Sequence, residues 1–150
     1  MLAPGDKAPN FTLIAGDGST VSLTSLRGSK VVLYFYPKDD TSGCTKEACS
    51  FNENLSAVRK KGAVVIGVSA DPQESHAKFA AKYGLTFPLL SDPEKKMLHA
   101  YGVWKQKSMY GRVFQGIERT TFIIDAQGRI SHIFPKVKVV GHTEEVLAVL

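Results

Sequence analysis

The sequence contains few cysteines and no long hydrophobic run, and each shortage excludes a class of protein. Only two of its 150 residues are cysteine, so a scaffold stapled by disulfides is excluded. No apolar stretch approaches the roughly 18–20 residues that a bilayer-spanning helix needs, which excludes a membrane-spanning chain. Charged residues make up 22% and hydrophobic residues 43%, so a largely disordered chain is excluded as well. The composition predicts a single globular domain over residues 1–150 with a core of its own.

The chain also lacks a strong excess of charge. Nineteen basic and fourteen acidic residues give a net charge of +5, and the two signs are interspersed along most of the chain. The dense basic cluster Arg59-Lys60-Lys61 precedes Gly62, a pattern typical of a helix end, and no aromatic residues interleave it as a base-stacking platform would require. No nucleic-acid partner is therefore expected. The N-terminus lacks the basic and apolar segments of a secretory signal, so we expect a cytoplasmic protein.

Hydrophobic patterns alternate between strands and helices along the chain. The expected strands cover residues 11–14, 20–23, 31–36, 63–68, 87–90, 120–124 and 130–134, and the expected helices cover 42–61, 72–83, 92–100 and 143–150. The first two strands form an N-terminal β-hairpin and the last two an antiparallel pair, which makes the sheet mixed. This order predicts an α/β protein of thioredoxin-like fold, with helices on both faces of a mixed central sheet.

Cys44 stands where a central strand gives way to a helix, a place where chemistry is common in α/β sheets. A cysteine in the first helical turn faces unpaired N–H groups and the positive end of the helix dipole, which favour the reactive thiolate. Asp40, Thr41 and Ser42 are suitable N-cap residues, and Gly43 removes side-chain bulk beside the sulfur. An inert, buried cysteine is the alternative, but it fits poorly with this polar surrounding.

The spacing of Cys44 and Cys49 limits how the two thiols can meet. On a regular α-helix, residues five apart have Cα atoms roughly 8.7 Å from each other. A disulfide requires roughly 4.4–6.8 Å. The two cysteines therefore cannot bond while such a helix is intact, and any disulfide between them requires its first turns to unwind.

The same segment resembles a known family. Pro37-x-x-x-Thr41-x-x-Cys44 is similar to the active-site motif of the peroxiredoxins, and the surrounding residues resemble the Q-type branch, also called bacterioferritin comigratory protein. The resemblance extends along essentially the whole chain. It includes Gly-Asp-Lys-Ala-Pro-Asn-Phe at residues 5–11 and Gly-Ile-Glu-Arg-Thr-Thr-Phe-Ile-Ile-Asp at residues 116–125.

The resemblance implies a thiol peroxidase that uses no metal or other cofactor. Cys44 matches the peroxidatic cysteine, which becomes a sulfenic acid, and Cys49 matches the resolving cysteine, which converts it to an intramolecular disulfide. Thr41 matches the hydroxyl that hydrogen-bonds the peroxide, Pro37 the residue that shields the sulfur, and Arg119 the arginine beside the thiolate. The implied substrates are hydrogen peroxide and organic hydroperoxides, the implied reductant is thioredoxin or a similar dithiol, and the implied state is a monomer.

Elementary chemistry is compatible with these roles. The guanidinium of Arg119 stays charged at any working pH and would stabilise a thiolate. Glu47 lies three residues beyond Cys44 on the same helix face, so it is expected to orient Arg119, although a solvated surface glutamate is nearly as well supported. For Trp104 and Tyr110, a loop near the active site and ordinary packing both remain open.

Other functions find less support in the residues. The four histidines, His76, His99, His132 and His142, are scattered and lack metal-ligand spacing with the cysteines, so no metal site is predicted. Nothing in the sequence directs His99 or His132 to a cysteine, as a Cys–His hydrolase would require. A thioredoxin-type reductase would need Cys-x-x-Cys, which is absent. A redox-sensing or chaperone-like binding protein that uses the same cysteine pair remains the alternative.

Overall fold

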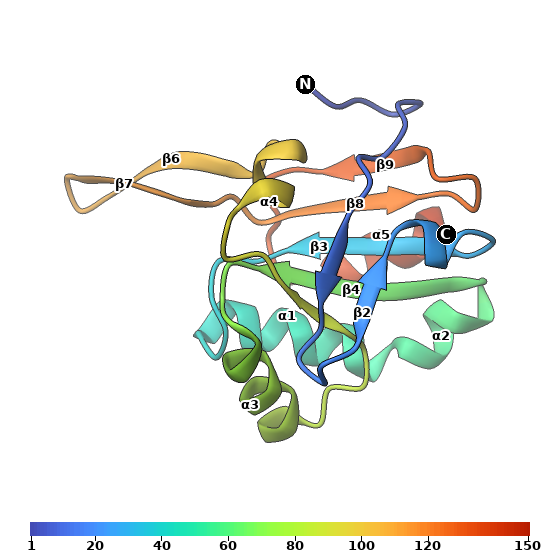
Figure 1. Cartoon of the computed structure of the whole chain (residues 1–150), viewed down its shortest axis with the longest axis horizontal. Helices are drawn as coiled ribbons and strands as arrows, with labels where there is room; N and C mark the ends of the chain where they lie inside the picture. Colours follow the sequence, from blue (N-terminus) through green and yellow to red (C-terminus); the bar gives the residue numbers. More distant parts are fainter.

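A computed structural model describes residues 1–150 and is built around a mixed five-stranded sheet (Figure 1). The strand order is β5-β4-β3-β8-β9. Strands β3 (Lys30–Phe35), β4 (Ala63–Ser69) and β5 (Leu89–Ser91) run parallel to one another. Strands β8 (Thr120–Ile124) and β9 (Ile130–Phe134) are antiparallel to their neighbours. The predicted mixed sheet with an antiparallel pair at one edge is confirmed.

Strand β3 is central because its side chains are apolar on both faces of the sheet. Val31, Leu33 and Phe35 belong to one core cluster, whereas Val32 and Tyr34 belong to a second cluster on the other face. This division follows from the two-residue period of a strand. The carboxyl end of β3 is therefore held firmly where the chain leaves for the segment that carries Cys44.

Four helices cover one face of the sheet. They are α1 (Ser42–Glu53), α2 (Leu55–Lys60), α3 (Gln73–Tyr83) and α5 (His142–Val149), and each contributes buried residues to the second cluster. The other face is covered by α4 (Lys96–Ala100) and by the N-terminal segment. Helices thus lie on both faces, as predicted. No helix is both long and apolar enough to cross a membrane.

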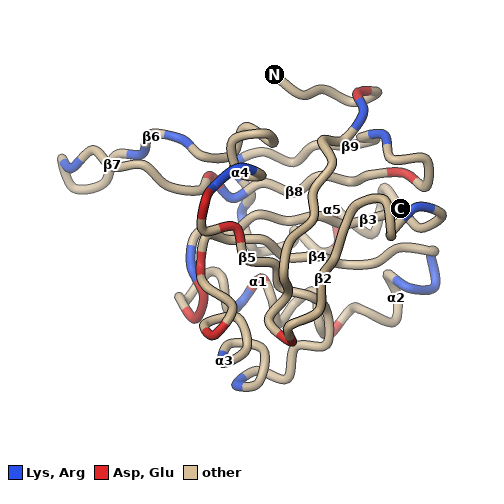
Figure 2. Tube along the Cα trace, in the orientation of Figure 1, with Lys and Arg blue, Asp and Glu red and all other residues tan.

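The predicted N-terminal hairpin is present as a separate two-stranded sheet. Strands β1 (Thr12–Ile14) and β2 (Thr20–Ser22) pair antiparallel, and a 3-10 turn, η1 (Thr24–Leu26), follows. The basic cluster lies at a helix end, as expected: Arg59 and Lys60 form the last turn of α2, and Gly62 follows with a positive φ of 75°. Figure 2 shows this blue end of α2 and the spread of both charge signs over the rest of the chain.

The prediction of one continuous helix over residues 42–61 was wrong, because the segment forms two helices. Asn54 separates α1 from α2, and its side-chain amide donates to the Ser50 carbonyl at 2.8 Å. An asparagine that bonds nearby backbone in this way competes with the helical pattern. Leu55 and Val58 are nevertheless buried, so the apolar spacing predicted burial correctly but not an unbroken helix.

A hairpin at residues 104–117 was not predicted. Strands β6 (Trp104–Met109) and β7 (Arg112–Ile117) pair antiparallel and extend away from the sheet, as Figure 1 shows. Tyr110 and Gly111 connect them with φ values of 51° and 74°, the positive pair that a tight type I′ turn needs. Two boundaries also differ from the prediction. The strand expected at 87–90 is β5 at Leu89–Ser91, and the helix expected from 92 begins at Lys96.

Candidate active site

The loop between β3 and α1 places Cys44 in the first turn of α1. Thr41 occupies the N-cap position, and the N–H of Thr45 donates to the Thr41 carbonyl at 2.8 Å as the first helical hydrogen bond. The N–H groups of Ser42, Gly43 and Cys44 precede that bond. They therefore present the donors and the positive dipole end of α1 beside the Cys44 sulfur.

Arg119 lies against the Cys44 thiol. It sits on the short link between β7 and β8, and its Nη2 is 3.4 Å from Cys44 Sγ. Cys44 itself is 1% exposed. A Cβ at Gly43 would come within 3.2 Å of the same Nη2, so glycine leaves the room that the guanidinium occupies.

Glu47 holds the other side of the guanidinium. Its Oε1 accepts a hydrogen bond from Arg119 Nη1 at 2.6 Å, and its side chain is only 2% exposed. The surface alternative for Glu47 is therefore wrong. Burial raises the pKa of Glu47 to about 7, against the opposing effect of the Arg119 charge. Arg119 consequently bridges a buried carboxyl group and a buried thiol on one face of α1.

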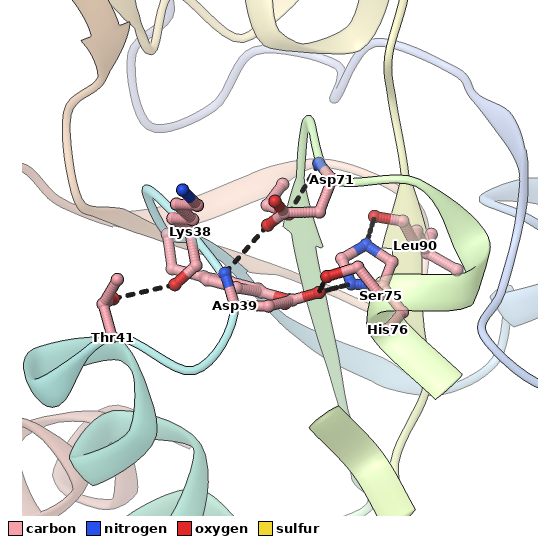
Figure 3. Close-up of polar contacts among 9 residues, drawn as sticks. Lys38, Asp39, Thr41, Asp71, Ser75, His76 and Leu90 are labelled. Carbon is pink, nitrogen blue, oxygen red and sulfur yellow. Dashed lines mark hydrogen bonds and ion pairs between the residues drawn. The ribbon is translucent and has the colours of Figure 1, made fainter. Parts of the chain in front are cut away.

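Thr41 and Pro37 lie in the loop that leads to this site. The Thr41 side chain is exposed and does not cap the helix; its hydroxyl donates to the Lys38 carbonyl at 2.8 Å (Figure 3). The hydroxyl oxygen keeps its lone pairs free to accept a proton donor. Pro37 is half-buried and begins the loop two residues after the end of β3.

Cys49 lies on the same helix but in different surroundings. Both cysteines are free, and α1 is continuous from Ser42 to Glu53. Cys49 is half-buried, and burial together with the Glu53 carboxylate raises the pKa of its thiol. Since helical residues five apart have Cα atoms roughly 8.7 Å from each other, this conformation keeps the two sulfurs from bonding.

The β6–β7 hairpin carries one residue whose electrostatics respond to the site. Burial and the Arg119 charge lower the pKa of Lys107, a residue in the middle of β6. Trp104 donates to the Gln115 side chain at 2.8 Å, and its ring packs against the core. Tyr110, at the hairpin tip, is 97% exposed.

Sequence reasoning missed a polar cluster behind the loop. The carboxylate of Asp39 contacts His76 of α3 at 2.7 Å, and the Asp39 N–H donates to Asp71 at 2.8 Å (Figure 3). The same carboxylate accepts a hydrogen bond from Tyr36 at 2.6 Å. Possible ligand atoms of Asp39, Asp71 and His76 lie within 4.8 Å of one another. In this arrangement those carboxylates and the imidazole already bond protein groups. No sequence signal joined His76 to Asp39, because 37 residues separate them.

Comparison with known proteins assigns the family. The sequence model of the AhpC/TSA family matches residues 4–133. The chain belongs to the AhpC/TSA family. It is 48% identical over 146 residues to peroxiredoxin Bcp of Bacillus subtilis, covering 97% of this chain and 93% of that protein.

Solved structures agree with this assignment. A cysteine-to-serine mutant of Xylella fastidiosa PrxQ superimposes with a TM-score of 0.94 at 40% identity, covering 99% of this chain and 94% of that one. Bacterioferritin comigratory protein of Xanthomonas campestris, described with an alkyl peroxide reduction activity, gives 0.88 at 42% identity, with 93% and 88% covered. The predicted Q-type peroxiredoxin branch, thioredoxin-like fold and thiol peroxidase class are thereby confirmed. A peroxide substrate and a thiol reductant follow from the family.

Proposed function

We propose that this chain reduces hydrogen peroxide and organic hydroperoxides with Cys44 as the nucleophile. The observation that carries the proposal is the contact of 3.4 Å between Arg119 Nη2 and Cys44 Sγ at the start of α1. A cation and a helix N-terminus beside one thiol favour its thiolate, the form that attacks peroxides. The alkyl peroxide reduction described for the Xanthomonas campestris relative supports the inclusion of organic hydroperoxides.

The first step forms a sulfenic acid on Cys44. The thiolate attacks one peroxide oxygen, the O–O bond breaks, and the departing oxygen takes a proton to leave as water or an alcohol. Arg119 stabilises the negative charge that grows on the departing oxygen. The Thr41 oxygen accepts the peroxide O–H, because the Thr41 hydroxyl proton is given to the Lys38 carbonyl. Pro37 shields the sulfur from bulk water.

The second step forms a disulfide within the chain. The Cys49 thiolate attacks the Cys44 sulfur, the S–O bond breaks, and the hydroxyl leaves with a proton as water. The continuous helix between the cysteines must first unwind over its first turns. The raised pKa of the Cys49 thiol keeps this residue protonated until that movement exposes it.

A dithiol donor of the thioredoxin type then reduces the disulfide with two electrons and restores both thiols. The proposed resolving cysteine lies on the same chain as Cys44, so one copy holds both cysteines of the cycle; this supports a monomer. A sequence with only two cysteines and no disulfide scaffold supports a cytoplasmic location. One five-stranded sheet supports a single domain, residues 1–150, as the working unit.

The test is a titration of the reduced protein with equimolar hydrogen peroxide, followed by thiol counting and intact mass. We expect rapid loss of both thiols and a mass decrease of about 2 Da, for the two hydrogens removed. Cys44→Ser should abolish the reaction, whereas Cys49→Ser should react once and stop at the sulfenic acid. Unchanged thiols in the wild type would contradict the proposal. Oxidation without rapid thioredoxin-dependent turnover would favour a redox sensor instead.

A further inference from the structure

The loop that carries Thr41 is fastened to α3 by two consecutive carboxylates. Asp39 is buried and bonds His76 and Ser75 of α3, each at 2.7 Å. Asp40 is exposed and bonds Lys82 at 2.8 Å and Tyr83 at 2.6 Å, also on α3. The two attachments differ mainly in burial. Ion pairs exposed to water contribute little to stability, so the buried attachment dominates.

Both ring nitrogens of His76 make polar contacts. Its Nε2 faces the Leu90 carbonyl at 2.9 Å, and a carbonyl can only accept, so Nε2 carries a hydrogen. Its Nδ1 lies 2.7 Å from the Asp39 carboxyl group, which also accepts hydrogen bonds from the Tyr36 and Ser75 hydroxyls. His76 therefore links the Asp39 side chain to the backbone of β5.

The surroundings of Asp39 favour its carboxylate form. Burial raises its pKa, but hydrogen bonds from His76 and Tyr36 outweigh that effect and hold the pKa of Asp39 below its ordinary value. The His76 and Asp39 side chains are only 0% and 4% exposed. Removing one of them leaves the polar group of the other buried without this partner, which makes the attachment stiff.

The attachment reaches the peroxide site through Lys38, Asp39 and Thr41 of the loop. The Asp39 N–H is fixed on Asp71 at 2.8 Å, and the carbonyl of Lys38 belongs to the same peptide unit as that N–H. That carbonyl accepts the Thr41 hydroxyl at 2.8 Å (Figure 3). Because a peptide unit is planar, fixing the Asp39 N–H also fixes the direction of the Lys38 carbonyl. The orientation of the Thr41 hydroxyl thus depends on how Asp39 is held.

We propose that the buried contact between Asp39 and His76 positions the Pro37–Thr41 loop, and with it the Thr41 hydroxyl, for the reaction of peroxide at Cys44. His76 is a positioning residue, because it acts through Asp39 and Lys38 rather than on the peroxide. The inference rests on the proposed function and assigns to α3 a part in that reaction. It predicts that loss of the pair slows the peroxide reaction selectively, since Arg119 and its contact with Cys44 are left in place.

The test compares two rate constants in a Cys49→Ser background, where the reaction stops after one step. One is the rate constant of Cys44 with hydrogen peroxide, which needs the positioned hydroxyl. The other is the rate constant with iodoacetamide, which needs only an accessible thiolate. His76→Gln keeps a donor near the Nε2 position and loses the one at Nδ1, whereas His76→Asn does the reverse.

We expect His76→Gln to lower the peroxide rate constant by about 10- to 100-fold and to leave the iodoacetamide rate constant within about twofold. His76→Asn should recover most of the loss. Asp39→Asn, a variant of nearly unchanged size, carries the same expectation as His76→Gln. Asp40→Asn is the matched control, because it lies on the same loop and loses an exposed pair; its peroxide rate constant should change less than twofold.

Three comparisons among these rate constants would overturn the inference. They are an equal fall of both rate constants, a His76→Gln variant no slower than Asp40→Asn, and better recovery by His76→Gln than by His76→Asn, which would assign the role to the Leu90 bond. An increase in the peroxide rate constant on adding Zn²⁺ would also overturn it, in favour of a metal site. A parent Cys49→Ser protein that reacts no faster than free cysteine would instead contradict the proposed function.

Discussion

The first turn of α1 and the turns that follow it place two cysteines in opposite electrostatic surroundings. Cys44 is almost fully buried and contacts the Arg119 guanidinium. Cys49 is more exposed, and burial together with the Glu53 carboxylate raises the pKa of its thiol. The more exposed thiol is thus the one that its surroundings hold protonated. A cation beside Cys44, and burial together with a carboxylate beside Cys49, support the proposal that Cys44 rather than Cys49 is the nucleophile.

The largest effect is expected from removing Arg119, the cation that lies beside Cys44. Arg119→Met should lower the rate constant of Cys44 with hydrogen peroxide by about 100- to 1,000-fold, because a preorganised donor to the departing oxygen is lost. The labelling rate of Cys49 should stay unchanged. Stopped-flow mixing with peroxide and mass-resolved labelling of each cysteine measure the two effects. A fall of less than about fivefold in the peroxide rate constant would contradict this role for Arg119.

A smaller effect concerns the carboxyl group that shares Arg119. The folded state holds a proton on Glu47 up to about pH 7, whereas the ordinary pKa is 4.5, so the folded state binds more protons between these values. Stability from this group is fully present below about pH 4.5 and is lost as the pH rises to about 7. At about 1.4 kcal/mol per pKa unit, this loss is about 3 kcal/mol, an order-of-magnitude figure.

Glu47→Gln should abolish that pH dependence. The free energy of unfolding of the wild type relative to Glu47→Gln should fall by about 3 kcal/mol between pH 4.5 and 7.5, as measured by urea denaturation of the reduced proteins. Glu53→Gln is the matched control, since Glu53 is exposed on the same helix. A difference between wild type and Glu47→Gln that stays constant across this pH range would show that Glu47 titrates normally.

The smallest expected effect tests the room beside the guanidinium. Gly43→Ala would place a methyl group 3.2 Å from Arg119 Nη2, so the guanidinium has to shift by a few tenths of an ångström. We expect the peroxide rate constant to fall about three- to tenfold without loss of thermal stability, because alanine favours the helix. Ser42→Ala, at the exposed neighbouring position, should leave the rate unchanged. Equal rates for both variants would mean that Arg119 tolerates the shift.

The sequence predicted the parts of the fold that local patterns control. The apolar run at residues 31–36 indicated a central strand, and the helix after it placed Cys44 in a first turn. The hairpin at 104–117 was not predicted, because its strands are mostly exposed and lack alternating apolar residues. Tyr110 in its turn is also an unusual residue for a positive φ. The break between α1 and α2 at Asn54 was not predicted, because the residues after it keep the burial pattern of a helix.

The residues of the candidate site were likewise predicted only in part. The motif around Cys44 and the resemblance led to Arg119, and the structure brings the two side chains together. The burial of Glu47 and the Asp39–His76 pair could not be predicted, because each depends on tertiary packing between segments distant in sequence. A polar pair buried by such packing leaves no local periodicity to detect.

Hydrogen exchange of the α1 amides before and after oxidation measures whether this helix unwinds when the two cysteines bond. The reduced protein should protect the amides of residues 45–49, since α1 is continuous from Ser42 to Glu53. After one equivalent of peroxide has formed the disulfide, verified by mass, we expect this protection to be lost while that of α3 persists. A disulfide between Cys44 and Cys49 with protection of residues 45–49 unchanged would contradict it, because an intact helix keeps the two sulfurs apart.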